Sequence, residues 1–250
     1  MLPGDVASNP AIAFRGVAVN RGGRAILHEV TLAVEAGEVV ALVGRSGSGK
    51  TTLLRLVNRL AIADAGDVAV SGRDVAGWDQ IALRRSVGYA IQDVGLFPHF
   101  TVADNIAIVP RLLEWPTPRV AARVDELLTL IGLEPARYRD RWPDQLSGGQ
   151  RQRVGLARAL AADPPVLLMD EPFGALDPIT RVELHREFKA LQAKLPRAVL
   201  LVTHDLAEAF ALAARVAVLH EGRVVACDTP TRLGEVDDPH VRALLETRFG

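Results

Sequence analysis

Runs of apolar residues along the chain predict a series of strands. Residues 12–19 and 27–34 alternate apolar and polar side chains, as strands with one buried face do. The denser apolar run at 38–43 is typical of a strand that is buried on both faces. Shorter apolar runs predict further strands near 67–71, 87–91, 166–169 and 198–203.

The segments between these strands have apolar residues at helical spacing, which predicts helices. A helix is expected from Gly49 to about Leu60, and residues 118–131 place their apolar side chains on one helical face. Thr101 and Asp104 have the spacing of a pair that caps the start of a helix. Further helices are predicted over 179–194, 205–213 and 240–248.

The order of these elements predicts a single α/β domain over residues 1–250. Strands that alternate with helices favour a largely parallel sheet with crossover helices. The mainly helical segment 96–162 is then expected to be a subdomain, inserted between two parts of an α/β core at 1–95 and 163–250.

Composition narrows the classes of function. The 250 residues are 49% hydrophobic and 24% charged, which is enough apolar material for a substantial core. Lysine and arginine number 29 against 30 acidic residues, so the chain lacks the basic excess of a nucleic-acid binder and no nucleic-acid partner is expected. Cys227 is the only cysteine, which excludes an internal disulfide and a cysteine-based zinc site and is typical of a cytoplasmic protein.

Membrane insertion is not expected for this chain. No window approaches 18 consecutive apolar residues, and the N-terminus lacks the basic and apolar regions of a signal peptide. Any role at a membrane must therefore come through a partner.

Residues 44–51 read GRSGSGKT and match the phosphate-binding P-loop pattern. Glycines let backbone N–H groups curl around phosphate oxygens, and the helix that follows adds unpaired donors. Lys50 can reach the β- and γ-phosphates, and the Thr51 hydroxyl can ligate Mg²⁺. A glycine-rich turn with an accidental lysine is the alternative, but the predicted strand–loop–helix order favours nucleotide binding. The expected nucleotide-binding residues here are Gly44, Arg45, Ser46, Gly47, Ser48, Gly49, Lys50, Thr51 and Thr52.

Two further motifs lie downstream. The apolar strand at 166–169 leads into Asp170 and Glu171, of which the first can hold Mg²⁺ and the second can polarise an attacking water as a general base. Acidic residues also end ordinary strands at a surface. The segment LSGGQ at 146–150 precedes a helical run, so its N–H groups and the Ser147 hydroxyl can face an anion. The alternative there is an ordinary serine cap followed by two glycines.

Along the chain the P-loop comes first, LSGGQ second and the Asp170–Glu171 pair third. With the three motifs in this order, the sequence resembles the ABC transporter ATPase family over nearly its whole length. Gln92, the segment Ala175-Leu176-Asp177 and His204 also stand where the family pattern has them. The resemblance implies a P-loop NTPase core with a mostly parallel sheet, an antiparallel β part near the N-terminus and an inserted helical subdomain. It also implies ATP and Mg²⁺ as cofactors.

The resemblance further implies a head-to-tail homodimer or pseudo-dimer of ATPase subunits with two ATP molecules between them. Each nucleotide would contact the P-loop of one subunit and the LSGGQ segment of the other. Gln92 would sense Mg²⁺ or water and link the site to a permease, His204 would hold the γ-phosphate, and Asp177 would couple the two sites. The expected catalytic residues are then Glu171, His204 and Gln92, the metal ligands are Thr51, Gln92 and Asp170, and the partner-site residues are Ser147, Gly148, Gly149 and Gln150.

One position departs from the family pattern. The family usually stacks an aromatic residue on the adenine, and Arg21 stands at that position, followed by Gly22. A guanidinium group can stack on a planar base, so Arg21 is expected to take this role.

Residues 88–115 are similar to the motor subunits of importers for osmoprotectants such as glycine betaine, choline and carnitine. This likeness implies an integral membrane permease, an extracytoplasmic substrate-binding protein, and a peripheral position on the cytoplasmic face of the membrane. The expected permease contacts are Phe97, Pro98, His99 and Phe100. Many such subunits carry regulatory CBS domains, for which 250 residues leave no room.

Two alternatives remain open. An ABC ATPase for another solute, such as an amino acid, a lipid or a drug, would share the same motifs. An ABC ATPase that acts on nucleic acid is disfavoured by the single P-loop, the single LSGGQ segment and the net charge of −1.

Overall fold

The computed structural model describes residues 9–91, 94–174 and 176–246. By its internal contacts the chain divides into two compact units, which are described separately below. Unit one comprises Met1–Leu83 and Pro196–Gly250, and unit two comprises Arg84–Leu195. The segment 96–162, expected to be an inserted helical subdomain, lies within unit two.

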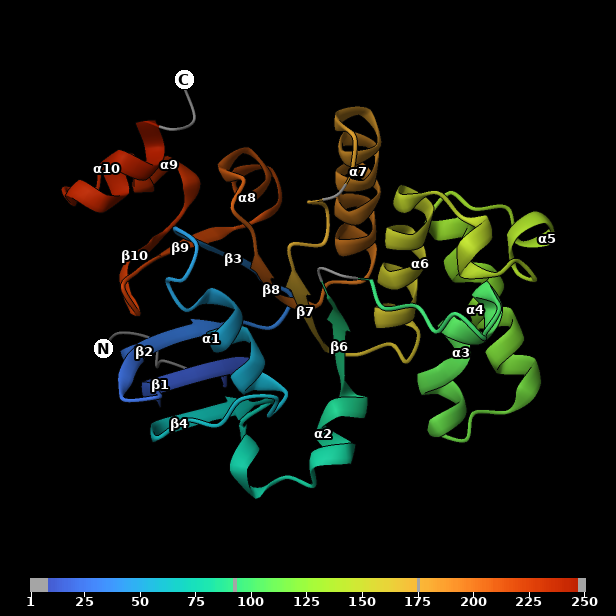
Figure 1. The fold of residues 1–250 in the computed structure, drawn as a ribbon, viewed down its shortest axis with the longest axis horizontal. Coiled ribbons are helices and arrows are strands. Elements are labelled where there is room, and N and C mark those ends of the chain that lie inside the picture. Colours follow the sequence, from blue (N-terminus) through green and yellow to red (C-terminus); the bar gives the residue numbers. More distant parts are fainter. Residues whose placement is uncertain (1–8, 92–93, 175, 247–250) are drawn as a thin grey trace, which may run out of the picture. The chain divides into compact units, whose positions relative to one another are not determined.

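Unit one contains an antiparallel sheet near the N-terminus (Figure 1). The predicted alternation places one face of β1 and β2 in the core, where Val17, Val19 and Leu27 are almost completely buried. Gly22 and Gly23 both have positive φ and form the tight turn between these strands. The sheet has the order β2-β1-β4-β5, with β1 at Ile12–Arg21, β2 at Arg24–Val34, β4 at Ala65–Val70 and β5 at Arg73–Asp74.

The second group of strands in unit one surrounds β3 (Val39–Val43). This strand pairs in parallel with β8 (Ala198–Val202) on one side and β9 (Arg215–His220) on the other. β10 (Arg223–Asp228) then pairs antiparallel with β9. Every residue of β3 and β8 is buried, as their continuous apolar sequences predict.

A bidentate ion pair anchors the start of β3. The Arg215 guanidinium contacts the two Glu38 carboxylate oxygens at 2.6 and 2.8 Å and also donates to the Ala33 carbonyl. Burial raises the pKa of Glu38, but the hydrogen bonds from Arg215, the hydrogen bond from the Glu35 N–H and the charge of Arg215 together outweigh this effect, so the pKa lies below its ordinary value. The pair ties β2, β3 and β9 together at one end.

Helix α1 (Lys50–Val57) contacts both β4 and β8, and so joins the two groups of strands in unit one. Its apolar face buries Leu53, Leu54 and Leu56. The sequence predicts an end near Leu60, but the helix ends at Val57, because Arg59 takes a positive φ. The other helices of this unit are α8 (Leu206–Leu212), α9 (Pro230–Leu233) and α10 (Pro239–Glu246).

Unit two contains two parallel strands, β6 (Val87–Ala90) and β7 (Val166–Asp170), together with a group of helices. Helix α3 packs against α4 and α6, and α6 also contacts β6. The Thr101 hydroxyl accepts a hydrogen bond from the Asp104 N–H, which confirms the predicted cap. The helices are α3 (Val102–Leu112), α4 (Thr117–Leu130), α5 (Pro135–Tyr138), α6 (Gly148–Leu160) and α7 (Pro178–Lys194), and α2 (Gln80–Ser86) spans the boundary between the units.

All seven predicted strands are present, shifted by a few residues at their ends. The prediction missed α2, β5, β9, β10 and α9. In the described part of the chain, no helix is both long and apolar enough to cross a bilayer.

Gly88 provides a test of the packing in unit two. A Cβ at this position would lie 2.4 Å from the Ala159 carbonyl oxygen and 2.9 Å from Leu167. Gly88→Ala is therefore expected to lower the free energy of unfolding by about 1–3 kcal/mol. Gly77→Ala is the matched control, because a Cβ there meets nothing within 4 Å. Urea denaturation measures both variants, and equal stabilities would contradict the packing account.

Candidate functional site

The loop at residues 44–49 connects β3 to α1, as predicted. Gly44, Gly47 and Gly49 have positive φ angles of 151°, 79° and 104°. A side chain at Gly44 is excluded by sterics as well, because a Cβ would lie 2.1 Å from the Leu219 carbonyl oxygen and 3.0 Å from the Ser48 hydroxyl. The loop conformation therefore depends on glycine at this position.

Lys50 lies at the first position of α1, and its side chain is buried. Its ammonium group donates to the carbonyl oxygens of Gly44 and Arg45 at 2.7 and 3.0 Å. The positive charge is thereby held inside the curve of the loop. Because the N–H groups of the first helical turn have no partner within the helix, this end of α1 can receive an anion.

The turn between β9 and β10 supports the loop from outside. The Gly222 N–H donates to the Ser48 carbonyl oxygen, and the His28 N–H donates to the Gly222 carbonyl oxygen. A Cβ at Gly222 would lie 2.4 Å from the Ile26 carbonyl oxygen, so this turn also requires glycine. β2, the β9–β10 turn and the loop thus form one connected structure within unit one.

An open pocket of about 860 Å³ lies in front of this loop. Its two arginines, Arg24 and Arg45, outnumber the single acid, Glu221, and His28 and His220 line it as well. This charge balance favours a polyanionic ligand such as a triphosphate. The remaining lining residues are Ala25, Ile26, Ser46, Gly47, Ser48 and Gly222.

Arg21 is not among the residues that line this pocket in the described chain. Arg24, its cross-strand partner in the β1–β2 hairpin, does line it. Arg24 and His28 belong to no sequence motif, because their proximity to the loop depends on the register of the hairpin.

His204 follows β8 at the edge of the strands where the P-loop begins. The Thr203 N–H donates to the Leu42 carbonyl oxygen, which places the two strand ends side by side. His204 itself is exposed. The structure therefore brings together, within unit one, the predicted P-loop residues and His204.

Asp170 and Glu171 lie at the end of β7 in unit two. Asp170 is buried, and Glu171 takes a positive φ of 48°. A residue other than glycine in this conformation costs about 1–2 kcal/mol, and such strain is often found at functional sites. Gln92, the third predicted catalytic residue, lies outside the described residues.

The LSGGQ segment forms the start of α6. Ser147 is the N-cap: its hydroxyl accepts from the Gln150 N–H, and the Gln150 side chain accepts from the Ser147 N–H. This reciprocal pair fixes the first turn. Ser147 and Gly148 are both exposed, so the N-terminus of α6 faces solvent within its own unit.

The segment after Glu171 packs against the same helix. A Cβ on Gly149 would lie 3.2 Å from the Leu176 side chain, so α6 and this segment approach closely. Asp177 then caps α7 by accepting from the Thr180 N–H at 3.0 Å. Hydrogen bonds from Thr180 lower the pKa of this exposed carboxyl below its ordinary value.

A buried strand, a glycine-rich loop that curls around a lysine, and the helix that follows define a P-loop NTPase. Comparison with known proteins narrows this class. The family model described as ABC transporter matches residues 27–174, more than half of the chain. The chain therefore belongs to the ABC transporter family.

Three curated relatives show the range of this similarity. The choline transport ATP-binding protein OpuBA of Bacillus subtilis is 48% identical over 210 residues, covering 84% of this chain and 55% of the relative. The glycine betaine uptake system ATP-binding protein YehX of Escherichia coli is 48% identical over 219 residues, covering 88% and 71%. The Fe(3+) ions import ATP-binding protein FbpC 1 of Rhodococcus jostii is 48% identical over 226 residues, covering 89% and 63%. The chain spans about half the length of the first curated relatives it matches.

The fold is similar to that of a solved cassette. The dimeric post-hydrolysis structure of the ATP-binding cassette MJ0796 bound to ADP and Pi has a TM-score of 0.78 and 31% sequence identity. The match covers 87% of this chain and 98% of that cassette.

Gly44 provides a test of the loop geometry. In Gly44→Ala, the loop must move away from the Leu219 carbonyl oxygen, which costs about 1–3 kcal/mol by overpacking. The affinity for MgATP is expected to fall by about tenfold to a hundredfold. Gly234→Ala is the control, because its Cβ would make only an ordinary contact at 3.6 Å. Binding of a fluorescent ATP analogue measures both, and unchanged affinity in Gly44→Ala would contradict the geometric account.

Proposed function

We propose that this chain binds MgATP and hydrolyses it as the motor subunit of an ABC importer. The observation that carries the proposal is the P-loop of unit one, where Lys50 and the glycine conformations form an anion cradle beside a basic pocket. Membership of the ABC transporter family supports it.

Within this proposal, Lys50 and His204 contact the γ-phosphate, and Glu171 is the general base. Its strained backbone and its place at a strand end support that role. Thr51, Gln92 and Asp170 are the proposed Mg²⁺ ligands. A hydroxyl, an amide and a carboxylate supply the oxygen donors that Mg²⁺ prefers, so the residues fit the ion. Bound Mg²⁺ would neutralise charge on the phosphates.

The proposed active form is a head-to-tail dimer. Ser147, Gly148, Gly149 and Gln150 of one subunit would contact the nucleotide held by the P-loop of the other. The capped N-terminus of α6 supports this role, because Ser147 and Gly148 are exposed there and a helix N-terminus favours an anion. The dimer of the MJ0796 cassette with ADP and Pi is consistent with it. Asp177, which caps α7 beside α6, would couple the two sites.

Arg21 is proposed to contact the adenine base, as the family pattern implies. Arg24, which lines the pocket, is the alternative stacking group on structural grounds.

The proposed permease contact is the exposed aromatic loop of unit two. Phe97, His99 and Phe100 form a cluster of ring contacts with centroids 4.6–5.9 Å apart, and Phe97 is 43% exposed. Pro98 lies within it. An exposed aromatic cluster is typical of an interaction surface. The subunit would then act at the cytoplasmic face of the membrane, with a permease and an extracytoplasmic binding protein as partners.

The proposed solute is a quaternary amine of the osmoprotectant type. The relatives named for choline and for glycine betaine support this assignment. The relative named for Fe(3+) import has the same sequence identity to the chain, 48%, so ferric iron is the competing cargo.

Glu171→Gln separates nucleotide binding from chemistry. The amide cannot accept the proton of the attacking water, so the hydrolysis rate is expected to fall by about 10²–10⁴-fold. ATP binding should persist, and the dimer should accumulate in size-exclusion chromatography. Lys50→Ala, in contrast, should lose ATP binding itself. Hydrolysis at the native rate in Glu171→Gln would show that another group is the base.

Uptake by cells tests the cargo. Labelled choline, glycine betaine and ferric iron are offered to cells that carry either the native protein or Glu171→Gln. We expect the uptake of choline or betaine to collapse in the variant, while iron uptake is unchanged. Loss of iron uptake alone would assign the chain to iron import. If none of the three changes, the importer assignment loses its support, whereas ATP hydrolysis by the purified protein remains a separate result.

A further inference from the structure

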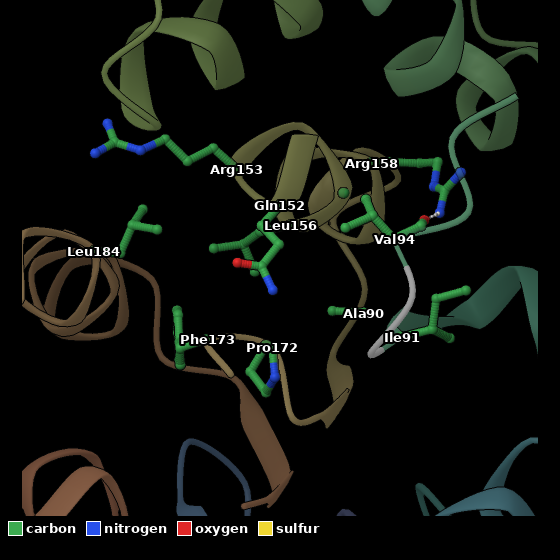
Figure 2. A pocket seen from close by; sticks show the side chains of 11 residues that line it. Ala90, Ile91, Val94, Gln152, Arg153, Leu156, Arg158, Pro172, Phe173 and Leu184 are labelled. Atoms are coloured by element: carbon green, nitrogen blue, oxygen red, sulfur yellow. Dashed lines mark hydrogen bonds between the residues drawn. The ribbon is translucent and has the colours of Figure 1, made fainter. Parts of the chain in front are cut away.

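Arg158, near the C-terminal end of α6, holds the main chain of a neighbouring loop. Its guanidinium donates to the Val94 carbonyl oxygen at 2.6 Å and to the Gly95 carbonyl oxygen at 2.8 Å. Figure 2 shows the side chain reaching from α6 to this loop. Both acceptors are neutral, and among the described residues Arg158 has no acidic partner. It therefore acts as a clamp on the backbone of this loop.

The Arg158 side chain is half-buried, and burial lowers the pKa of its guanidinium below the ordinary value. Hydrogen bonds from a charged group to carbonyl oxygens are stronger than neutral ones, and more so away from water. A planar guanidinium can also serve two successive carbonyl groups at once, which an ammonium does less well.

Close packing reinforces the same contact. A Cβ at Gly155, one turn before Arg158, would lie 2.4 Å from a methyl carbon of Val94. On the other side of the loop, Gly88 of β6 brings its strand against the Ala159 carbonyl oxygen of the same helix. α6 thus contacts the chain both before and after positions 92–93, at β6 and at Val94–Gly95.

The chain beyond Gly95 is held in a different way. The fully buried Asn105 of α3 accepts from the Phe97 N–H and donates to the carbonyl oxygens of Phe97, Phe100 and Thr101. The aromatic loop is therefore fixed to α3. Among the residues that the structure describes, Arg158 holds the short segment Val94–Gly95.

We propose that Arg158 is a positioning residue that couples the start of α6 to the loop after Gln92. This inference rests on the proposed function, in which Ser147 at the start of α6 contacts nucleotide in the closed dimer. Ser147 and Arg158 lie about 16 Å apart along the axis of one continuous helix. Because a helix moves as a stiff body, displacement at Ser147 reaches Val94 and Gly95 through the clamp. Arg158 thereby transmits dimer closure to the residues that flank Gln92.

Amide hydrogen exchange tests this transmission directly. Purified protein in the Glu171→Gln background is compared with and without MgATP, with Arg158 intact or changed to Gln. Three peptides report separately: the LSGGQ segment at 146–151, the clamped segment at 94–97, and the Asn105-held segment at 100–106. Arg153→Gln is the matched control, since Arg153 lies on the same helix but donates to Ile131 and Glu183 instead.

With Arg158 intact, we expect MgATP to slow exchange in all three segments. Arg158→Gln should reduce the response of 94–97 by about fivefold or more, the low end of coupling between distinct sites, and leave 146–151 and 100–106 responsive. Arg153→Gln should retain all three responses. Arg158→Lys should restore the response at 94–97 only in part.

Other outcomes would overturn the inference. An unchanged response of 94–97 in Arg158→Gln would show that the clamp transmits nothing. Loss of all three responses, or the same loss in Arg153→Gln, would show that Arg158 only stabilises the fold. If the LSGGQ segment itself ignores MgATP while Arg158 is intact, the proposed dimer closure fails and the inference falls with it. If that segment responds and 94–97 does not, the inference fails alone.

Discussion

The phosphate site depends on the close approach of two backbones at Gly44. The loop can pass beside the Leu219 carbonyl oxygen only because Gly44 has no side chain, and this approach brings the β9–β10 turn against Ser48. The Lys50 ammonium then fills the inside of the curve and offsets the carbonyl groups that point into it. β9 and β10, which contribute no motif, therefore decide the shape of the phosphate site.

A similar constraint operates in unit two, where α6 is the central element. Glycines at 88 and 155 let β6 and Val94 approach this helix more closely than a Cβ would permit, and Gly149 lets Leu176 approach to a tight contact. Polar groups then fix the register: the capping box at Ser147 sets the start of α6, and Arg158 holds the loop at Val94–Gly95. This one helix begins with the LSGGQ segment and contacts both the chain after Glu171 and the chain at Val94–Gly95. It therefore has a central place in any coupling of these segments.

Local chemistry made much of this protein predictable. The buried strands at 38–43, 166–169 and 198–203 are continuous apolar runs, and such runs have few alternatives to a covered parallel strand. The cap at Thr101 and the helix start at Ser147 follow from residue types at fixed spacing. The strands at 215–228 were not predicted, because their short apolar runs leave helix and strand undecided.

The sequence by itself determined the class of fold and the chemistry-bearing segments, because the P-loop, LSGGQ and the Asp170–Glu171 pair depend on residues that are neighbours in the chain. Tertiary structure alone decided which distant residues join them. Hairpin register brings Arg24 and His28 to the pocket, strand pairing aligns His204 with the start of the P-loop, and helix packing sets Arg158 on the Val94 and Gly95 carbonyl groups. Such contacts leave no local signal, since they depend on the three-dimensional path of the backbone and not on the spacing of side chains along it.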